Sequence, residues 1–72
     1  MISTVSMRIL LRQQRSGLYL QASGAWGRER ETARSFASSI EAYSWAIEQS
    51  LLNTEVLLAF SDEHYDMVSM RV

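Results

Sequence analysis

The sequence predicts a small α+β domain: a four-stranded antiparallel sheet in two layers, with one main helix on one face. Apolar and polar residues alternate in the first third of the chain and again toward the C-terminus, which is typical of strands. Between residues 38 and 52 apolar residues recur at helical spacing instead. A chain of 72 residues makes one domain, spanning residues 1–72, and it contains no cysteine that could form a disulfide or a thiolate metal site.

The first two strands are predicted to form a hairpin. Residues 5–11 and 18–22 each alternate apolar with polar side chains. Gly17 lies between them and tolerates the positive φ that a tight turn needs. The conformation of residues 23–37 is left open by the sequence, although we expect a short helical turn near residues 31–35 with Ala33 and Phe36 facing inward.

The helix has the clearest local pattern. Ser38 is a good N-cap, and Glu41 three residues later completes a capping box. Asn53 suits the left-handed residue that ends a helix. We therefore expect a helix over residues 38–52 whose apolar stripe faces the sheet and consists of Ile40, Tyr43, Ala46, Ile47 and Leu51.

The last two strands complete a ββαββ chain. Residues 55–60 are apolar on both faces, which is the pattern of a central strand. A polar break at residues 61–64 then precedes a fourth strand, in which we expect Val68 to lie opposite Leu57. A right-handed connection through the helix gives the antiparallel strand order 2-1-3-4.

One helix covers one face of such a sheet, and we expect the other face to be open. That face collects apolar residues from all four strands, and the interface candidates on it are Leu10, Tyr19, Leu57, Val68 and Met70. Large exposed apolar patches mark interaction sites, so the pattern predicts a homodimer, or contact with another protein, through this face. Face-to-face contact and edge-to-edge pairing through the last strand are both open.

A second cluster suggests a ligand or nucleic-acid site, and its members are Trp26, Arg28, Arg30 and Arg34. An aromatic ring beside arginines can stack on a base or hold a phosphate. The alternative interpretation is structural: Trp26 closes one end of the core while the arginines pair with neighbouring glutamates. The net charge of −1 gives no general attraction to nucleic acid, so we do not expect nucleic acid as the main partner.

The sequence contains no recognisable catalytic constellation. His64 is the single histidine and lies among Asp62, Glu63 and Asp66, where we expect solvated polar groups and no metal site or general base. A serine–histidine–acid order and a glycine-rich phosphate loop are both absent from the sequence. We therefore expect a protein that is not an enzyme and that has no catalytic residues, metal or cofactor.

The chain is expected to be cytoplasmic and to have no membrane contact. Its apolar runs are shorter than the roughly 20 residues of a membrane span. Arg8 and Arg12 interrupt the apolar stretch near the N-terminus, which is unlike a secretory signal.

About half of the chain resembles small uncharacterised bacterial ββαββ proteins. The likeness rests on Tyr19, Trp26 and the stretch Ala-Arg-Ser-Phe-Ala-Ser-Ser-Ile-Glu-Ala at residues 33–42. This motif is structural, so the resemblance implies no activity and no functional residues. The leading hypothesis is a non-enzymatic interaction module that self-associates through the open sheet face. The alternative is a small nucleic-acid-binding or regulatory protein that uses Arg8, Arg12 and the Trp26 loop.

Overall fold

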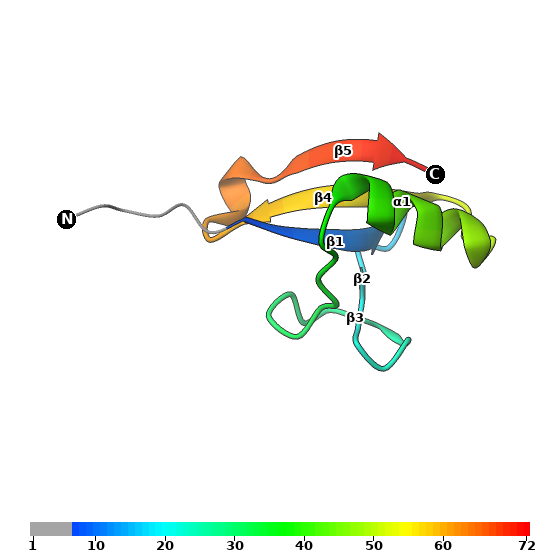
Figure 1. The fold of residues 1–72 in the computed structure, drawn as a ribbon. Coiled ribbons are helices and arrows are strands. Elements are labelled where there is room, and N and C mark those ends of the chain that lie inside the picture. The colour runs from blue at the N-terminus through cyan, green and yellow to red at the C-terminus, as the bar shows by residue number, and fades with distance from the viewer. Residues whose placement is uncertain (1–6) are drawn as a thin grey trace.

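The chain folds as an antiparallel sheet with one helix, the α+β class that the sequence predicts (Figure 1). A computed structural model describes residues 7–72, so the predicted place of Val5 in the first strand lies outside the described residues. The elements are β1 (Met7–Gln13), β2 (Tyr19–Leu20), β3 (Trp26–Gly27), α1 (Ser39–Glu48), β4 (Thr54–Phe60), the short 3-10 helix η1 (Glu63–Tyr65) and β5 (Met67–Arg71).

The strand order in the sheet is β3-β2-β1-β4-β5. It contains the predicted order of four strands, with β1 and β4 at the centre, but the prediction of four strands is wrong because β3 adds a fifth. Trp26 of β3 pairs with Leu20, within the segment 23–37 whose conformation the sequence left open. The physical reason is a tight turn: Gly24 has a φ of 93°, and its N–H donates to the Gln21 carbonyl at 2.9 Å.

The pairing of β4 with β5 contains a bulge. Leu57 lies opposite Val68 as expected, but the register then shifts and Val56 lies opposite Met70. Ser69 is therefore the extra residue on β5. Because side chains alternate between the two faces of a strand, the bulge moves Met70 to the face of Val56. The sequence-based assignment of Met70 to the face of Leu57 is wrong for this reason.

The helix-side core consists of Ile9, Leu11, Leu20, Phe36, Ala42, Ala46 and Val56. Helix α1 turns Ala42 and Ala46 toward the sheet, whereas Ile40 and Ile47 are 62% and 51% exposed. The predicted stripe through these two isoleucines is therefore wrong. Small alanine side chains let the helix lie close to the sheet, and Trp45 packs beside them on Phe36.

Helix α1 begins where predicted and ends earlier. The Ser38 hydroxyl accepts a hydrogen bond from the Glu41 N–H at 3.1 Å, which is the expected N-cap contact. Ser50 then adopts a φ of 56°, and the N–H of Leu51 donates to the Ala46 carbonyl at 2.9 Å. This is the Schellman arrangement that ends helices, built on a serine where glycine is usual. The resulting helix has only 10 residues and covers only part of one sheet face.

The second face of the sheet is closed, so the expectation of an open face is wrong. Leu10, Tyr19 and Leu57 are 0%, 9% and 1% exposed and form a second core with Ala33 and Ala59. The cover comes from the segment 28–36, which follows β3: Ala33 packs in the second core, whereas Arg34 and Phe36 of the same segment turn toward the helix side. Where a helical turn over residues 31–35 was expected, a turn at residues 31–32 leads into non-helical backbone, and backbone bridges at residues 33 and 36 hold the segment against the sheet.

Candidate functional site

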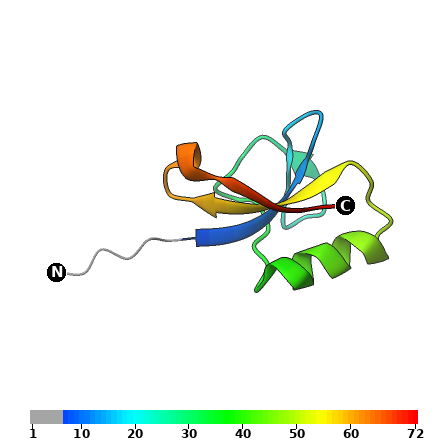
Figure 2. The ribbon, with the colours of Figure 1, turned by 90° about the horizontal axis from the view of Figure 1, so that it is seen from above.

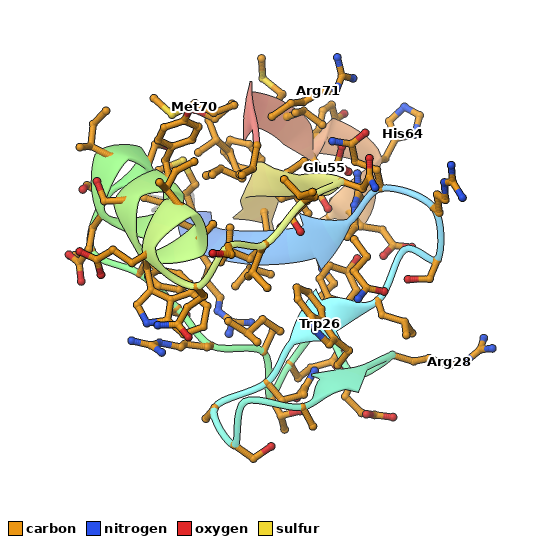
Figure 3. The ribbon with its side chains drawn as sticks, turned by 90° about the vertical axis from the view of Figure 1, so that its right-hand side faces the viewer. Trp26, Arg28, Glu55, His64, Met70 and Arg71 are labelled. Atoms are coloured by element: carbon orange, nitrogen blue, oxygen red, sulfur yellow. The ribbon has the colours of Figure 1, made fainter. Side chains whose placement is uncertain are left out.

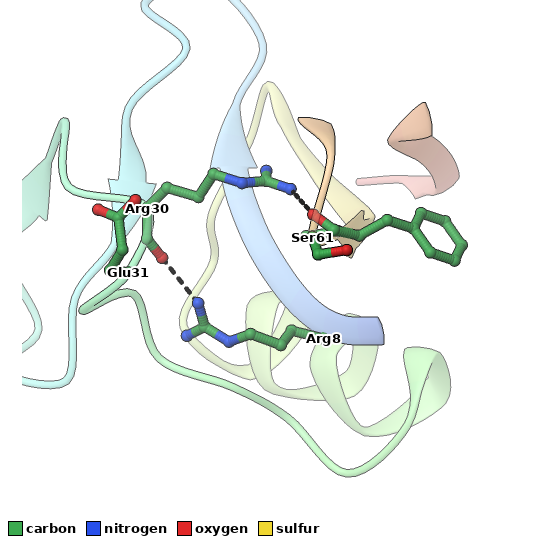
Figure 4. A pocket seen from close by; sticks show the side chains of 6 residues that line it. Arg8, Arg30, Glu31 and Ser61 are labelled. Carbon is green, nitrogen blue, oxygen red and sulfur yellow. Dashed lines mark hydrogen bonds between the residues drawn. The ribbon is translucent and has the colours of Figure 1, made fainter. Parts of the chain in front are cut away.

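Arg8 of β1 holds the covering segment onto the second face of the sheet. Its Nε donates to the Ser35 hydroxyl at 3.0 Å, and its Nη1 donates to the Arg30 carbonyl at 2.8 Å (Figure 4). Its Nη2 donates to the Ala33 carbonyl. One guanidinium group therefore makes three contacts with neutral acceptors on a single segment.

Arg30 ties the same segment to the chain around η1. Its guanidinium forms a bidentate ion pair with Asp66, in which the distance from Nη2 to Oδ1 is 2.7 Å. The same guanidinium also donates to the Phe60 carbonyl. The Arg30 and Asp66 side chains are only 15% and 9% exposed. The hydrogen bond to Asp66 raises the pKa of Arg30 despite the opposing effect of burial. The pair therefore links two parts of the chain that are 36 positions apart in the sequence.

A small cavity of about 120 Å³ lies between these two arginines (Figure 4). Its lining residues are Arg8, Arg30, Glu31, Ala59, Phe60 and Ser61. Both guanidinium groups in its wall already donate to protein acceptors that hold the covering segment to the sheet. The cavity is therefore a result of these structural contacts.

A second ion pair lies further along the same face. Glu55 is 6% exposed and accepts from Arg12 at 2.7 Å, while Arg71 lies 3.9 Å from its other oxygen. Burial acts to lower the pKa of Arg12, but the hydrogen bond to Glu55 and the charge of Glu55 outweigh it, so the pKa is raised. Arg8 and Arg12, which the alternative hypothesis assigns to nucleic acid, both have partners within the fold.

The interface candidates do not share one exposed surface. Leu10, Tyr19 and Leu57 are buried beneath the covering segment. Val68 is 36% exposed on the same face, whereas Met70 is half-buried against the helix-side core. The five interface candidates therefore lie on two faces of the sheet. The alternation of apolar and polar residues predicts neither the bulge that moves Met70 nor the segment that buries Leu10, Tyr19 and Leu57.

The predicted ligand cluster is also dispersed. Trp26 packs against the helix-side core, while Arg30 belongs to the opposite face. Arg28 extends into solvent (Figure 3). Arg34 stacks on the rings of Phe36 and Trp45. These residues are close in sequence, but the bends at residues 28 and 30 and the turn at residues 31–32 direct their side chains to different parts of the molecule.

The polar residues around His64 have structural contacts. Asp62 accepts from the His64 N–H at 2.9 Å and so caps η1, and Asp66 is paired with Arg30. The His64 ring itself is exposed and packs edge-on against Tyr65, with 5.4 Å between ring centroids. Across residues 7–72, no three histidine, aspartate or glutamate side chains converge as a metal site would require.

One group of large apolar side chains is exposed at an end of the sheet. We term it the apolar corner, and it consists of Met7, Phe60, Tyr65 and Met67. Met7, Tyr65 and Met67 are 47%, 64% and 59% exposed. A hollow of about 490 Å³ lies among Phe60, Tyr65 and Met67, with Ser61 and Asp62 at its margin.

The apolar corner belongs to the helix side of the sheet. Met7 pairs with Phe60, and Met67 lies opposite Leu58, whose side chain packs on the helix-side core. Helix α1 lies toward the other end of the strands (Figure 2). By alternation along the strands these residues belong to the face that the helix was expected to cover, but alternation identifies the face of a residue and not how far a short helix reaches along it.

No protein-family model, curated protein or solved structure matches this chain. The class that the fold defines is a small α+β domain with one antiparallel sheet. The likeness to small bacterial ββαββ proteins stays a prediction. In the part of the chain that the structure describes, no helix is long and apolar enough to cross a membrane.

Proposed function

We propose that this protein is a non-enzymatic interaction module that forms a homodimer through the apolar corner. The observation that carries the proposal is the exposure of Met7, Tyr65 and Met67 around one hollow. Contiguous exposed apolar side chains mark interaction surfaces, and methionine and aromatic residues are enriched at the centre of interfaces. The proposed function, self-association, is the same as in the sequence-based hypothesis, but the proposed surface is the apolar corner instead of an open sheet face.

A second copy of the chain is the partner that we favour. A domain of this size buries only about 60% of the surface that its unfolded chain exposes, so it gains stability from association. None of the four residues of the apolar corner carries a charge, so the centre of a contact between two copies would bury no charged side chain of the corner, while Asp62 lies at its margin. A two-fold axis through the corner makes each copy's surface the partner of the other, and methionine side chains adapt readily to such contacts.

Edge-to-edge pairing through β5 is the competing geometry. β5 is an outer strand of the sheet, so one of its edges has no neighbour among the described residues. The bulge at Ser69 and the exposed charge of Arg71 both oppose the addition of another strand there. We therefore favour contact through the apolar corner over contact through the edge.

The substitution Met67→Arg tests the proposal. We expect the unaltered protein to sediment as a dimer at micromolar concentration and the variant to sediment as a monomer with an unchanged circular-dichroism spectrum, because the interface would bury an unpaired charge. Leu52→Arg is the matched control, since Leu52 is 78% exposed and lies outside the corner. It should leave the dimer intact.

Two results would contradict this assignment. A monomeric unaltered protein across the micromolar range would remove self-association altogether. A dimer that survives Met67→Arg would exclude the corner as the contact and favour the edge of β5.

A titration with mixed oligonucleotides tests the alternative of nucleic-acid binding. Arg8, Arg12 and Arg30 are engaged within the fold, so we expect no binding at low salt. Binding that weakens steeply as salt rises would revive the alternative, because phosphate contacts release counterions. We keep a cytoplasmic location in the proposal, since the lack of cysteine suits a reducing compartment.

A further inference from the structure

Arg34 is fixed by aromatic rings. Its guanidinium carbon lies 4.8 Å from the ring centroid of Phe36 and 4.8 Å from that of Trp45. The two rings are themselves in contact, with centroids 5.9 Å apart and planes inclined by 54°. The backbone N–H of Arg34 donates to the Leu20 carbonyl at 2.8 Å, so the main chain beside the side chain is also held.

Within residues 7–72 the side-chain donors of Arg34 have no acceptor, unlike those of Arg8, Arg12 and Arg30. In residues 7–72, no carboxylate forms an ion pair with its guanidinium and no protein acceptor receives its N–H groups. Among these residues no buried side-chain nitrogen is without a partner, so the Arg34 nitrogens are open to solvent. The guanidinium therefore lies against the two rings, while its N–H groups meet no acceptor among these residues.

We propose that the Arg34 guanidinium binds an oxyanion, either a phosphate or a carboxylate group. A guanidinium group donates two parallel hydrogen bonds to either of these anions, and such charge-assisted bonds are stronger than neutral ones. Stacking on Phe36 and Trp45 already restricts the side chain, which lowers the entropy lost when an anion binds. This site uses no residue of the apolar corner and does not depend on the proposed dimer.

Two carboxylates on α1 set the strength of this site. Glu41 lies one turn before Trp45 and Glu48 one turn after it, so both lie on the side of α1 that carries Trp45. Neither forms an ion pair with Arg34 in the described part of the chain. Their negative charge weakens the attraction for a small anion, and Glu48→Gln should therefore tighten binding.

Trp45 reports directly on the site. The chain has two tryptophans, so Trp26→Phe leaves Trp45 as the single indole emitter. In this background we expect a saturable fluorescence change with inorganic phosphate or with acetate at constant ionic strength, and none with chloride. A response to phosphate alone assigns a phosphate site, a response to acetate alone assigns a carboxylate site, and both support an oxyanion site.

Arg34→Gln should weaken the response at least tenfold, whereas Arg28→Gln should leave it unchanged because Arg28 is exposed and, unlike Arg34, is not placed over either ring in the described residues. If Arg34→Gln does not fold, Arg34→Lys keeps the charge but loses the planar fork and should still weaken binding. The proposal is overturned by the absence of a response to both anions, by an equal response to chloride, or by an unaltered response in a folded Arg34 variant.

Discussion

At the scale of single residues, arginine side chains join parts of this chain that the sheet hydrogen bonds leave apart. Arg8 reaches across to Ala33, which is 25 positions away in the sequence, and Arg30 reaches Asp66, which is 36 positions away. A guanidinium group has five donors in a rigid plane and can serve several acceptors at once, which lysine cannot do in the same geometry. The use of arginine for every basic residue is consistent with these roles.

The substitution Asp66→Asn tests the link at residue scale. It leaves the Arg30 guanidinium partly buried without a counter-charge, so the free energy of unfolding should fall by about 2 kcal/mol. Urea denaturation followed by circular dichroism measures the change. Arg71→Gln is the control, because the Arg71 side chain is 70% exposed and its ion pair is long, and it should change stability by less than about 0.5 kcal/mol. Equal effects of the two substitutions would mean that the Arg30 link is no stronger than a surface pair.

At the scale of elements, local signals define the start of α1 more reliably than its end and its orientation. Ser38 caps the helix as its sequence context predicts. The end depends on Ser50 in a left-handed conformation, for which serine is not a strong signal. The side of α1 that is buried depends on how Ala42 and Ala46 fit against the sheet. This packing leaves Ile40 and Ile47 exposed, although the helical spacing of apolar residues predicts that they face the sheet.

The substitution Ser38→Ala removes the cap and should lower the free energy of unfolding by about 1 kcal/mol, because the Glu41 N–H loses its acceptor. Ser44→Ala provides the matched control, since Ser44 is exposed within the helix, where alanine is the better helix former. It should be neutral or slightly stabilising in the same urea titration. A Ser38→Ala variant as stable as the unaltered protein would show that the cap contributes nothing.

At the scale of the whole molecule, the sheet has a core on each face although the chain has only one helix. The helix supplies the cover on one side, and the covering segment 28–36 supplies it on the other through Ala33, whose carbonyl accepts from Arg8. An irregular segment can serve as a layer here because its backbone groups pair with the sheet and with arginine side chains. Among residues 7–72, the apolar corner is the part of the helix-side face that α1 does not cover (Figure 2).

The substitution Leu57→Ala tests whether the second core is real. Leu57 is 1% exposed, and its truncation should lower the free energy of unfolding by about 3 kcal/mol through lost burial and the cavity left behind. Val68→Ala, on the same face but 36% exposed, should lower it by less than about 1 kcal/mol. If both variants lose the same small amount in chemical denaturation, the second face is not closed in solution.

The sequence by itself determined the features that depend on neighbouring residues: the α+β class, the central position of β1 and β4, the cap at Ser38 and the pairing of Leu57 with Val68. Alternation and capping are local, so they can be read in order along the chain. Only the tertiary structure decided the cover over the second face, the face of Met70 and the exposure of the apolar corner. Each of these features depends on contacts between distant segments or on a bulge that cannot be recognised from the alternation of apolar and polar residues. Burial by such contacts decides which apolar residues remain exposed.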